Sequence, residues 1–263
     1  GHTCTELQGA ECSRSKLTTI LNITVDKVDE LFPRQVCATV LGMAKVAKHL
    51  RGARRNRRTE YYWTVFRDLL ATGNDVFRLF ATISARLLPS FDAQGLSNLA
   101  YAHALVEYLP VLDDGSTLFD HIAEKSIPQL ARFEPQELTN TIWAYAKSEV
   151  IHPGLFTKLG DHIAALDHLD EFLPQNLTNT IWAYATAGVV HRDLFQRVGD
   201  HIVELGHLDE FKPQELANTI WAYAKEGVEH SRLFEKVAEH IISLDNMDAF
   251  NEQEVSNLVW GFK

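Results

Sequence analysis

Acid–imidazole pairs recur along the chain, and they are the first residues to test for catalytic chemistry. In each pair an acidic residue directly precedes a histidine: Asp120–His121, Asp161–His162, Asp200–His201 and Glu239–His240. Adjacent residues on a helix point in different directions, so these pairs cannot act as catalytic dyads. The sequence also lacks a CxxC pair, an HExxH pair and a phosphate-binding glycine-rich loop. We therefore predict no enzyme, no metal site and no cofactor.

Amide and aromatic side chains recur in a spacing that predicts a binding surface. A glutamine, an asparagine four residues later and an aromatic residue three residues after that share one strip of a helix, because each residue advances by about 100°. Amides offer both donors and acceptors, and aromatic faces accept bases, cations or apolar chains. The predicted ligand-facing strip comprises Gln94, Asn98, Tyr101, Gln136, Asn140, Trp143, Lys147, Gln175, Asn179, Trp182, Gln214, Asn218, Trp221, Lys225, Gln253, Asn257 and Trp260.

A purely structural interpretation of this strip is open as well. Large aromatic residues at helical spacing usually belong to a core. The tryptophans would then pack between adjacent helices, and the amides would bond to the backbone across repeats. The two interpretations are compatible if one edge of each tryptophan stays exposed.

The strip belongs to a segment that the chain repeats. FEPQELTNTIWAYAK begins at Phe133, and copies begin at Phe172, Phe211 and Phe250, each 39 residues after the last. A weaker copy begins at Phe91, 42 residues before Phe133. A fixed period in this range indicates stacked units of secondary structure. We predict an all-α protein, a right-handed α-solenoid of helical-hairpin repeats of about 39 residues.

Local chemistry predicts how one repeat folds. Pro135 suits the first position of a helix, and Phe133 and Leu138 have the spacing of a hydrophobic staple. Leu138, Ile142 and Tyr145 share the face opposite the strip. The second helix has an apolar stripe formed by Leu155, Phe156, Leu159, Ile163 and Leu166. One hairpin cannot bury these faces alone, so neighbouring hairpins must stack.

The repeats divide the chain into three parts. Residues 1–31 form an N-terminal tail and entry segment, and residues 32–90 a degenerate first repeat with a basic insertion at 45–60. Residues 91–263 hold the tandem repeats, and the last of these is incomplete. Its single helix leaves an apolar face open for a further partner or for sequence beyond the chain. Neither a transmembrane segment nor a targeting segment is visible.

Charge is unevenly distributed along the chain. Residues 1–90 carry 14 Lys/Arg and 8 Asp/Glu, whereas residues 91–263 carry 11 and 27, for a net charge of −10. Positive charge is concentrated, without an intervening acid, in Lys45, Lys48, Arg51, Arg54, Arg55, Arg57 and Arg58. Such a patch is typical of binding to phosphates or another anionic partner. The alternatives are a solvated loop or pairing with an acidic neighbour.

The units FxPQxLxNTIWAYA, each followed by an LF…HI…L helix, resemble octotricopeptide repeats and the related FAST-kinase-like heptatricopeptide arrays. The resemblance covers residues 91–263 and, degenerately, residues 32–90. It implies an organellar α-solenoid, in a chloroplast or mitochondrion, that binds RNA and acts in RNA stability, processing or translation. Some such proteins are structural parts of organellar assemblies. The implied ligand face is the predicted strip.

Two functions therefore remain open at this point. The first is RNA binding, in which the basic patch grips phosphates beside the strip. The second is a protein scaffold or a structural subunit of a large complex, in which asparagines, tryptophans and acids hold an extended, basic partner segment. Because the strip hardly varies between repeats, base-by-base readout is disfavoured, and a uniform ligand suits it better.

Overall fold

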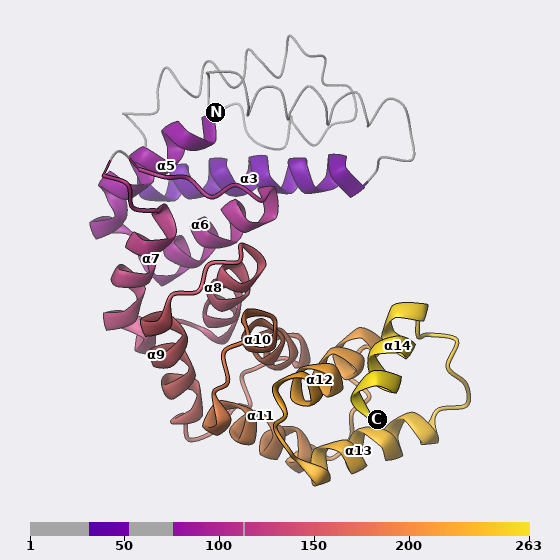
Figure 1. Cartoon of the computed structure of the whole chain (residues 1–263). Helices are drawn as coiled ribbons and strands as arrows, with labels where there is room; N and C mark the ends of the chain where they lie inside the picture. Colours follow the sequence, from indigo (N-terminus) through magenta and orange to yellow (C-terminus); the bar gives the residue numbers. More distant parts are fainter. Residues whose placement is uncertain (1–31, 53–75, 113) are drawn as a thin grey trace. The chain divides into compact units, whose positions relative to one another are not determined.

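The structure, a computed structural model, describes residues 32–52, 76–112 and 114–263 (Figure 1). The all-α prediction is confirmed, because these residues form eleven α-helices and no strand. The helices are α3 (Pro33–Gly52), α5 (Val76–Leu87), α6 (Ala93–Val106), α7 (Leu118–Ser126), α8 (Pro135–Lys147), α9 (Pro153–Ala164), α10 (Pro174–Ala187), α11 (Arg192–Glu204), α12 (Pro213–Glu226), α13 (Ser231–Ser243) and α14 (Glu252–Gly261). Short 3₁₀ helices, η2 (Leu88–Ser90) and η3 (Ile127–Arg132), precede α6 and α8. The chain divides into two compact units, residues 1–128 and 129–263.

In the first unit α6 packs along α3, and α5 and α7 complete the helical cluster. The buried thiol of Cys37 on α3 donates a hydrogen bond to the carbonyl of Gly95 on α6, 3.2 Å away. Burial raises the pKa of this thiol to about 12, so it stays protonated and unreactive at neutral pH. Cys4 and Cys12 lie outside the described residues.

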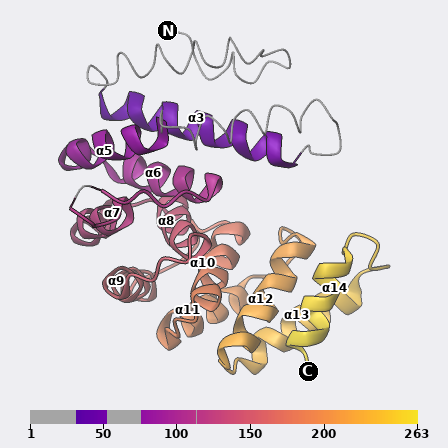
Figure 2. The same ribbon diagram turned by 45° about the horizontal axis from the view of Figure 1, so that its top comes forward.

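In the second unit the helices form two layers. The first helices of the repeats, α8, α10, α12 and α14, pack side by side in that order, and so do the second helices α9, α11 and α13 (Figures 1 and 2). Pro135, Pro174 and Pro213 are the first residues of α8, α10 and α12, as the sequence predicts. The residues expected to face the core, such as Leu138, are buried.

Hydrogen bonds between neighbouring helices recur at intervals of 39 residues. The hydroxyl of Tyr184 on α10 donates to the carbonyl of Phe156 on α9 at 2.6 Å, and Tyr223 does the same to Phe195 at 2.5 Å. Both tyrosines are completely buried, and burial raises the pKa of each phenol. The bond satisfies a buried hydroxyl that would otherwise lack a partner, and it fixes each first helix against the preceding second helix.

The first helices are joined by threonines. Thr139 Oγ1 lies 3.2 Å from Thr180 Oγ1, and Thr178 Oγ1 lies 3.1 Å from Thr219 Oγ1. Thr139 also donates to the carbonyl of Asn176 at 3.4 Å. These contacts are buried, so they set the register of α8, α10 and α12.

The second helices begin at histidines. The Nδ1 atoms of His152, His191 and His230 accept the backbone N–H of the residue three positions on, at 3.0 to 3.2 Å. Histidine is not among the preferred N-cap residues, so sequence reasoning did not identify these caps. In His191 and His230 the other ring nitrogen lies 3.2 Å from Asp161 and 3.3 Å from Asp200, both on the preceding second helix.

Two boundaries differ from the sequence-based prediction. Helix α9 ends at Ala164, so Leu166 lies beyond it, and the turn instead buries Leu169. Helix α3 continues to Gly52, so Lys45 and Lys48 lie on a helix and not in the inserted segment. Straight-chain lysines favour helix, which explains why α3 extends into the basic run.

Burial of His103 on α6 makes the stability of the first unit dependent on pH. Burial lowers the pKa of this imidazole from 6.5 to about 4. Between these values the unfolded chain binds a proton that the folded chain does not, so stability is complete above about pH 6.5 and falls as the pH decreases toward 4. His103→Phe keeps a ring but cannot take up a proton. We expect this variant to lack the acid-induced loss in the free energy of unfolding, which amounts to up to about 3 kcal/mol. Urea unfolding of the unaltered chain and of His103→Phe, at pH values between about 4 and 6.5, measures this effect. If the free energy of unfolding changes with pH equally in both, the prediction is wrong.

Glycine is required where each histidine cap lies against the preceding helix. A Cβ at Gly160 would approach the His191 ring to 2.4 Å, and one at Gly199 would approach the His230 ring to 2.4 Å. We expect Gly160→Ala and Gly199→Ala each to destabilise the protein by about 1 to 3 kcal/mol, because the ring must leave its cap. Nothing lies within 4 Å of a Cβ at Gly206, so Gly206→Ala is the control and should change stability by less than about 0.5 kcal/mol. Denaturant unfolding tests this, and equal stability of the three variants would refute it.

Candidate functional site

The residues of the predicted strip lie on the first helices α8, α10, α12 and α14 and, in the first unit, on α6. All of their glutamines are exposed, and all of their asparagines are half-buried. The aromatic residues are half-buried, except for Trp260, which is 51 % exposed. None of the strip residues is fully buried, so the strip is accessible to a ligand in each repeat.

The amides of the strip bond to one another and not to the backbone of neighbouring repeats. Asn257 donates to the Oδ1 atom of Asn218 on the neighbouring helix at 3.2 Å. Within one helix, Gln253 donates to Asn257 at 2.9 Å and Gln136 donates to Asn140 at 3.4 Å. The backbone bonds that the structural interpretation assigned to these amides are instead made by Thr139 and Thr178. The amide groups therefore keep unused donors and acceptors toward solvent.

Lysines accompany the tryptophans on two of the helices. Lys225 Nζ lies 4.8 Å from the centroid of the Trp221 ring, a cation–π contact one helical turn along α12. Lys147 occupies the same place on α8 and is exposed. The equivalent residue on α10 is Thr186, so Trp182 has no lysine at this spacing.

One variation between repeats lies outside the strip. Glu137, Asn176 and Glu215 occupy the third position of their helices, where each side chain accepts the backbone N–H of the N-cap residue at 2.8 to 3.0 Å. Both amides and carboxylates can accept this bond. The exchange of glutamate for asparagine is therefore structural and carries no information about a ligand.

The acidic residues of the second unit are concentrated away from the strip. The charged residues of the strip are the cations Lys147 and Lys225. Acids are exposed in the turns that end each hairpin, for example Asp170 and Asp209, and on the second helices, for example Asp161. The negative charge of the repeats therefore does not mark the strip itself as anionic.

The first helices end in a left-handed residue. Gly188 (φ 66°) and Gly227 (φ 61°) end α10 and α12, as the sequence predicts. After α8 this position is held by Glu149, with φ 57°. A residue with a Cβ is disfavoured in this conformation by about 1 kcal/mol relative to glycine, so the glutamate is retained at a cost in stability.

The basic patch is only partly described. Lys45 and Lys48 are exposed on α3, and the backbone of Arg51 belongs to the same helix. Arg54, Arg55, Arg57 and Arg58 lie outside the described residues. The role of the patch in binding an anionic partner remains a prediction.

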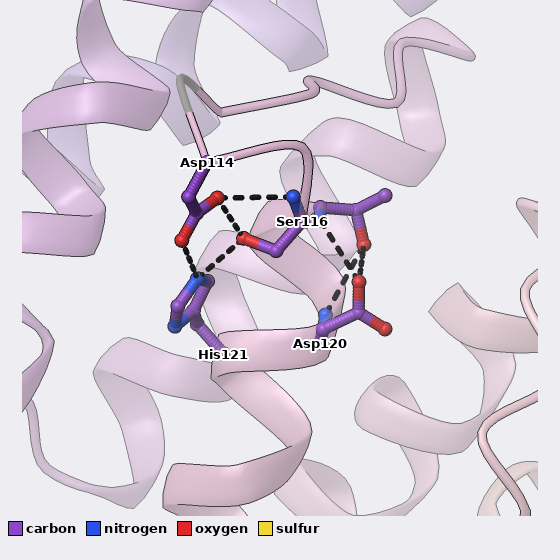
Figure 3. A network of polar contacts seen from close by, with 5 residues as sticks. Asp114, Ser116, Asp120 and His121 are labelled. Atoms are coloured by element: carbon purple, nitrogen blue, oxygen red, sulfur yellow. Dashed lines mark hydrogen bonds and ion pairs between the residues drawn. The ribbon is translucent and has the colours of Figure 1, made fainter.

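A serine, a histidine and an aspartate meet in the loop before α7 (Figure 3). Ser116 Oγ lies 2.7 Å from His121 Nε2, and Asp114 Oδ2 lies 3.8 Å from the same nitrogen. The Ser116 hydroxyl donates to Asp114 at 2.5 Å, and this bond is the main cause of the lowered pKa of Asp114. A hydrolytic triad needs the serine and the aspartate on opposite ring nitrogens, with the hydroxyl donating to the imidazole. This network holds the loop in place and does not activate the serine.

In the structure, the acid and the histidine of an acid–imidazole pair contact different residues. His201 lies 4.0 Å from Asp170 and His240 lies 3.9 Å from Asp209, whereas Asp161 and Asp200 face the histidine caps of the next hairpin. Among the described residues no three His, Cys, Asp or Glu side chains are placed to hold a metal ion. These residues serve contacts between repeats.

Helix α14 exposes apolar residues whose counterparts are buried. Val255 is 38 % and Val259 is 67 % exposed, whereas Leu216 and Ile220, at the same positions of α12, are at most 2 % exposed. In α12 these residues are covered by packing against the neighbouring helices. Trp260 and Phe262 extend the exposed face.

No helix in the described part of the chain combines the length and the apolar character needed to cross a bilayer. No protein-family model matches the chain, and a search of curated proteins finds no match. The function is therefore argued from the geometry of the strip and its surroundings.

Proposed function

We propose that the second unit is an α-solenoid of hairpin repeats and binds single-stranded RNA along the glutamine–asparagine–tryptophan strip. The observation that carries this proposal is that an exposed glutamine, a half-buried asparagine and an indole that is at least partly accessible recur at the same place on α8, α10, α12 and α14. Bases of any sequence can stack on aromatic side chains, and each stack contributes about 1 to 3 kcal/mol. The recurrence of helix contacts every 39 residues supports a regular spacing of these stacking positions.

The chemistry beside the indoles suits the remaining parts of a nucleotide. The side-chain amides can donate to and accept from base edges and the ribose hydroxyl. Lys147 and Lys225 are exposed at the end of the strip on their helices, within reach of a backbone phosphate. A nearly uniform strip favours a nucleic acid held without strong sequence preference.

Electrostatics does not oppose this function locally. The excess acid of residues 91–263 is carried in large part by the turns and the second helices. Exposed charges are screened over about 8 Å at physiological salt, so these acids reduce the affinity of the strip for RNA only modestly.

The repeat resemblance extends the proposal to a biological role. It favours a non-enzymatic factor of a chloroplast or mitochondrion that acts in RNA stability, processing or translation. This role depends on RNA binding and has no separate support in the geometry.

A protein scaffold is the second candidate, and the exposed face of α14 favours it. Val259, Trp260 and Phe262 form an apolar surface of the kind that often binds another protein. The exposed acids of the turns would attract a basic partner. This candidate gains if the chain fails to bind RNA.

RNA binding is tested with the whole chain and a labelled single strand of about 12 nucleotides, a length typical of such grooves. We expect Trp182→Ala and Trp221→Ala each to weaken binding by about tenfold, since each removes one stacking platform. Affinity should also fall as salt rises from about 50 to 200 mM, because bound phosphates release counterions. Fluorescence anisotropy measures both effects.

Lysine variants give the matched control for this experiment. Lys225→Ala should weaken binding. It should also reduce the slope of the logarithm of affinity against the logarithm of salt concentration by about one, because one phosphate contact is lost. Lys158, on the second helix α9, is exposed and paired at 3.7 Å with Asp161, so Lys158→Ala should leave the affinity unchanged. Undetectable binding by the unaltered chain, or equal effects of the two lysine variants, would refute the proposal.

A further inference from the structure

A hollow of about 400 Å³ opens between the ends of α8 and α10, beside the strip. Its walls include the Trp182 indole and Thr186 from α10, Lys147 from the last turn of α8, and Glu149 from the turn that follows. Ile151 and small apolar side chains complete the lining. A volume of this size accommodates a small flat ligand.

The Thr186 hydroxyl has no protein partner. It lines the hollow, its oxygen is inaccessible to solvent, and no hydrogen bond to it exists among the described residues. Because this oxygen is closed off from the hollow, the contribution of Thr186 is that it leaves the Trp182 ring without the lysine that lies over Trp221 in the next repeat.

Two differences from the following repeat meet in this hollow. Glu149 occupies the position that is Gly188 and Gly227 in the next two repeats, in the left-handed conformation that Glu107 also adopts after α6. Thr186 occupies the position of Lys225, whose ammonium group lies over Trp221. The corresponding space between α10 and α12 therefore has no carboxylate from the turn and has a lysine against its indole.

We infer that the hollow selects one guanine base, while the rest of the strip tolerates any base. The inference rests on the proposed RNA binding where the base belongs to a chain, and the same chemistry would take a free guanine nucleotide. A carboxylate offers two acceptors side by side, and guanine is the common base with two adjacent N–H donors on its pairing edge. The base stacks on Trp182, and Glu149 accepts both N–H groups. Lys147, which also lines the hollow, offers a positive charge to the guanine carbonyl or a phosphate.

The test compares strands of about 12 uridines with and without one central guanosine, bound to the whole chain. We expect the guanosine to tighten binding by about tenfold, the discrimination typical of one paired contact. Glu149→Gly should remove this preference and raise the affinity for the uridine strand only as much as Glu171→Gln does, because both variants lose one carboxylate. Because glycine is native to the equivalent positions and relieves the left-handed glutamate, this variant is not expected to lose its fold. Glu171→Gln, an exposed carboxylate in the turn after α9, is the control for lost charge.

Thr186→Lys provides an independent variant, because it copies the arrangement of α12 into α10. The new lysine covers the Trp182 ring and adds a positive charge. The affinity for the uridine strand should rise, and the guanosine preference should disappear. A merely structural role of Thr186 would not move the two quantities in opposite directions.

The outcomes separate the inference from the proposed function. Equal binding of both strands by the unaltered chain would overturn the inference and leave RNA binding in place. If neither strand binds, the proposed function fails. Guanosine monophosphate then serves as the probe, with tryptophan quenching as the readout. If the nucleotide quenches tryptophan fluorescence and Glu149→Gly abolishes the quenching, the hollow is a guanine site that takes the free nucleotide. If the nucleotide causes no quenching, the guanine site is refuted together with RNA binding.

Discussion

A hydrogen bond from a buried tyrosine hydroxyl to a backbone carbonyl of the preceding hairpin fixes the arrangement of the second unit. Tyr184 and Tyr223 each place a large ring in the core and satisfy its single polar atom at one defined point of α9 or α11. A buried hydroxyl without this partner would be costly, so few other positions of the two helices are stable. Because the bond recurs 39 residues on, each hairpin repeats the relation of the last, and the strip on the opposite face inherits that regularity.

The two helix layers of the second unit have different roles. The second helices begin at the histidine caps and carry the glycines that make room for them, and so they hold the hairpins together. The first helices bury Leu138 and its counterparts on one side and present amides and indoles on the other. A binding surface formed in this way is rigid before the ligand arrives, which lowers the entropy lost on binding.

Much of this arrangement follows from the sequence, since the period, the proline starts and the apolar spacing are all local features. The residues of the strip and of the core were placed on their correct faces for that reason. The histidine caps were not found, because histidine has no general preference for that position and acts here only with its ring against Gly160 or Gly199. The start of the basic insertion was placed at residue 45, within α3, because a run of positive charge reads equally well as a loop or as one face of a helix.

The hollow beside Trp182 could not be predicted for a different reason. Its residues come from two successive repeats, and only the packing of α8 on α10 brings Glu149 and Thr186 to one place. In a single repeat each looks like ordinary variation, a glutamate for a glycine or a threonine for a lysine. Together they remove a cation from an aromatic face and add a carboxylate beside it. Because Glu107 adopts the same left-handed conformation after α6, the hollow is distinguished by the combination of the Glu149 carboxylate with Thr186, and not by the conformation of the glutamate alone.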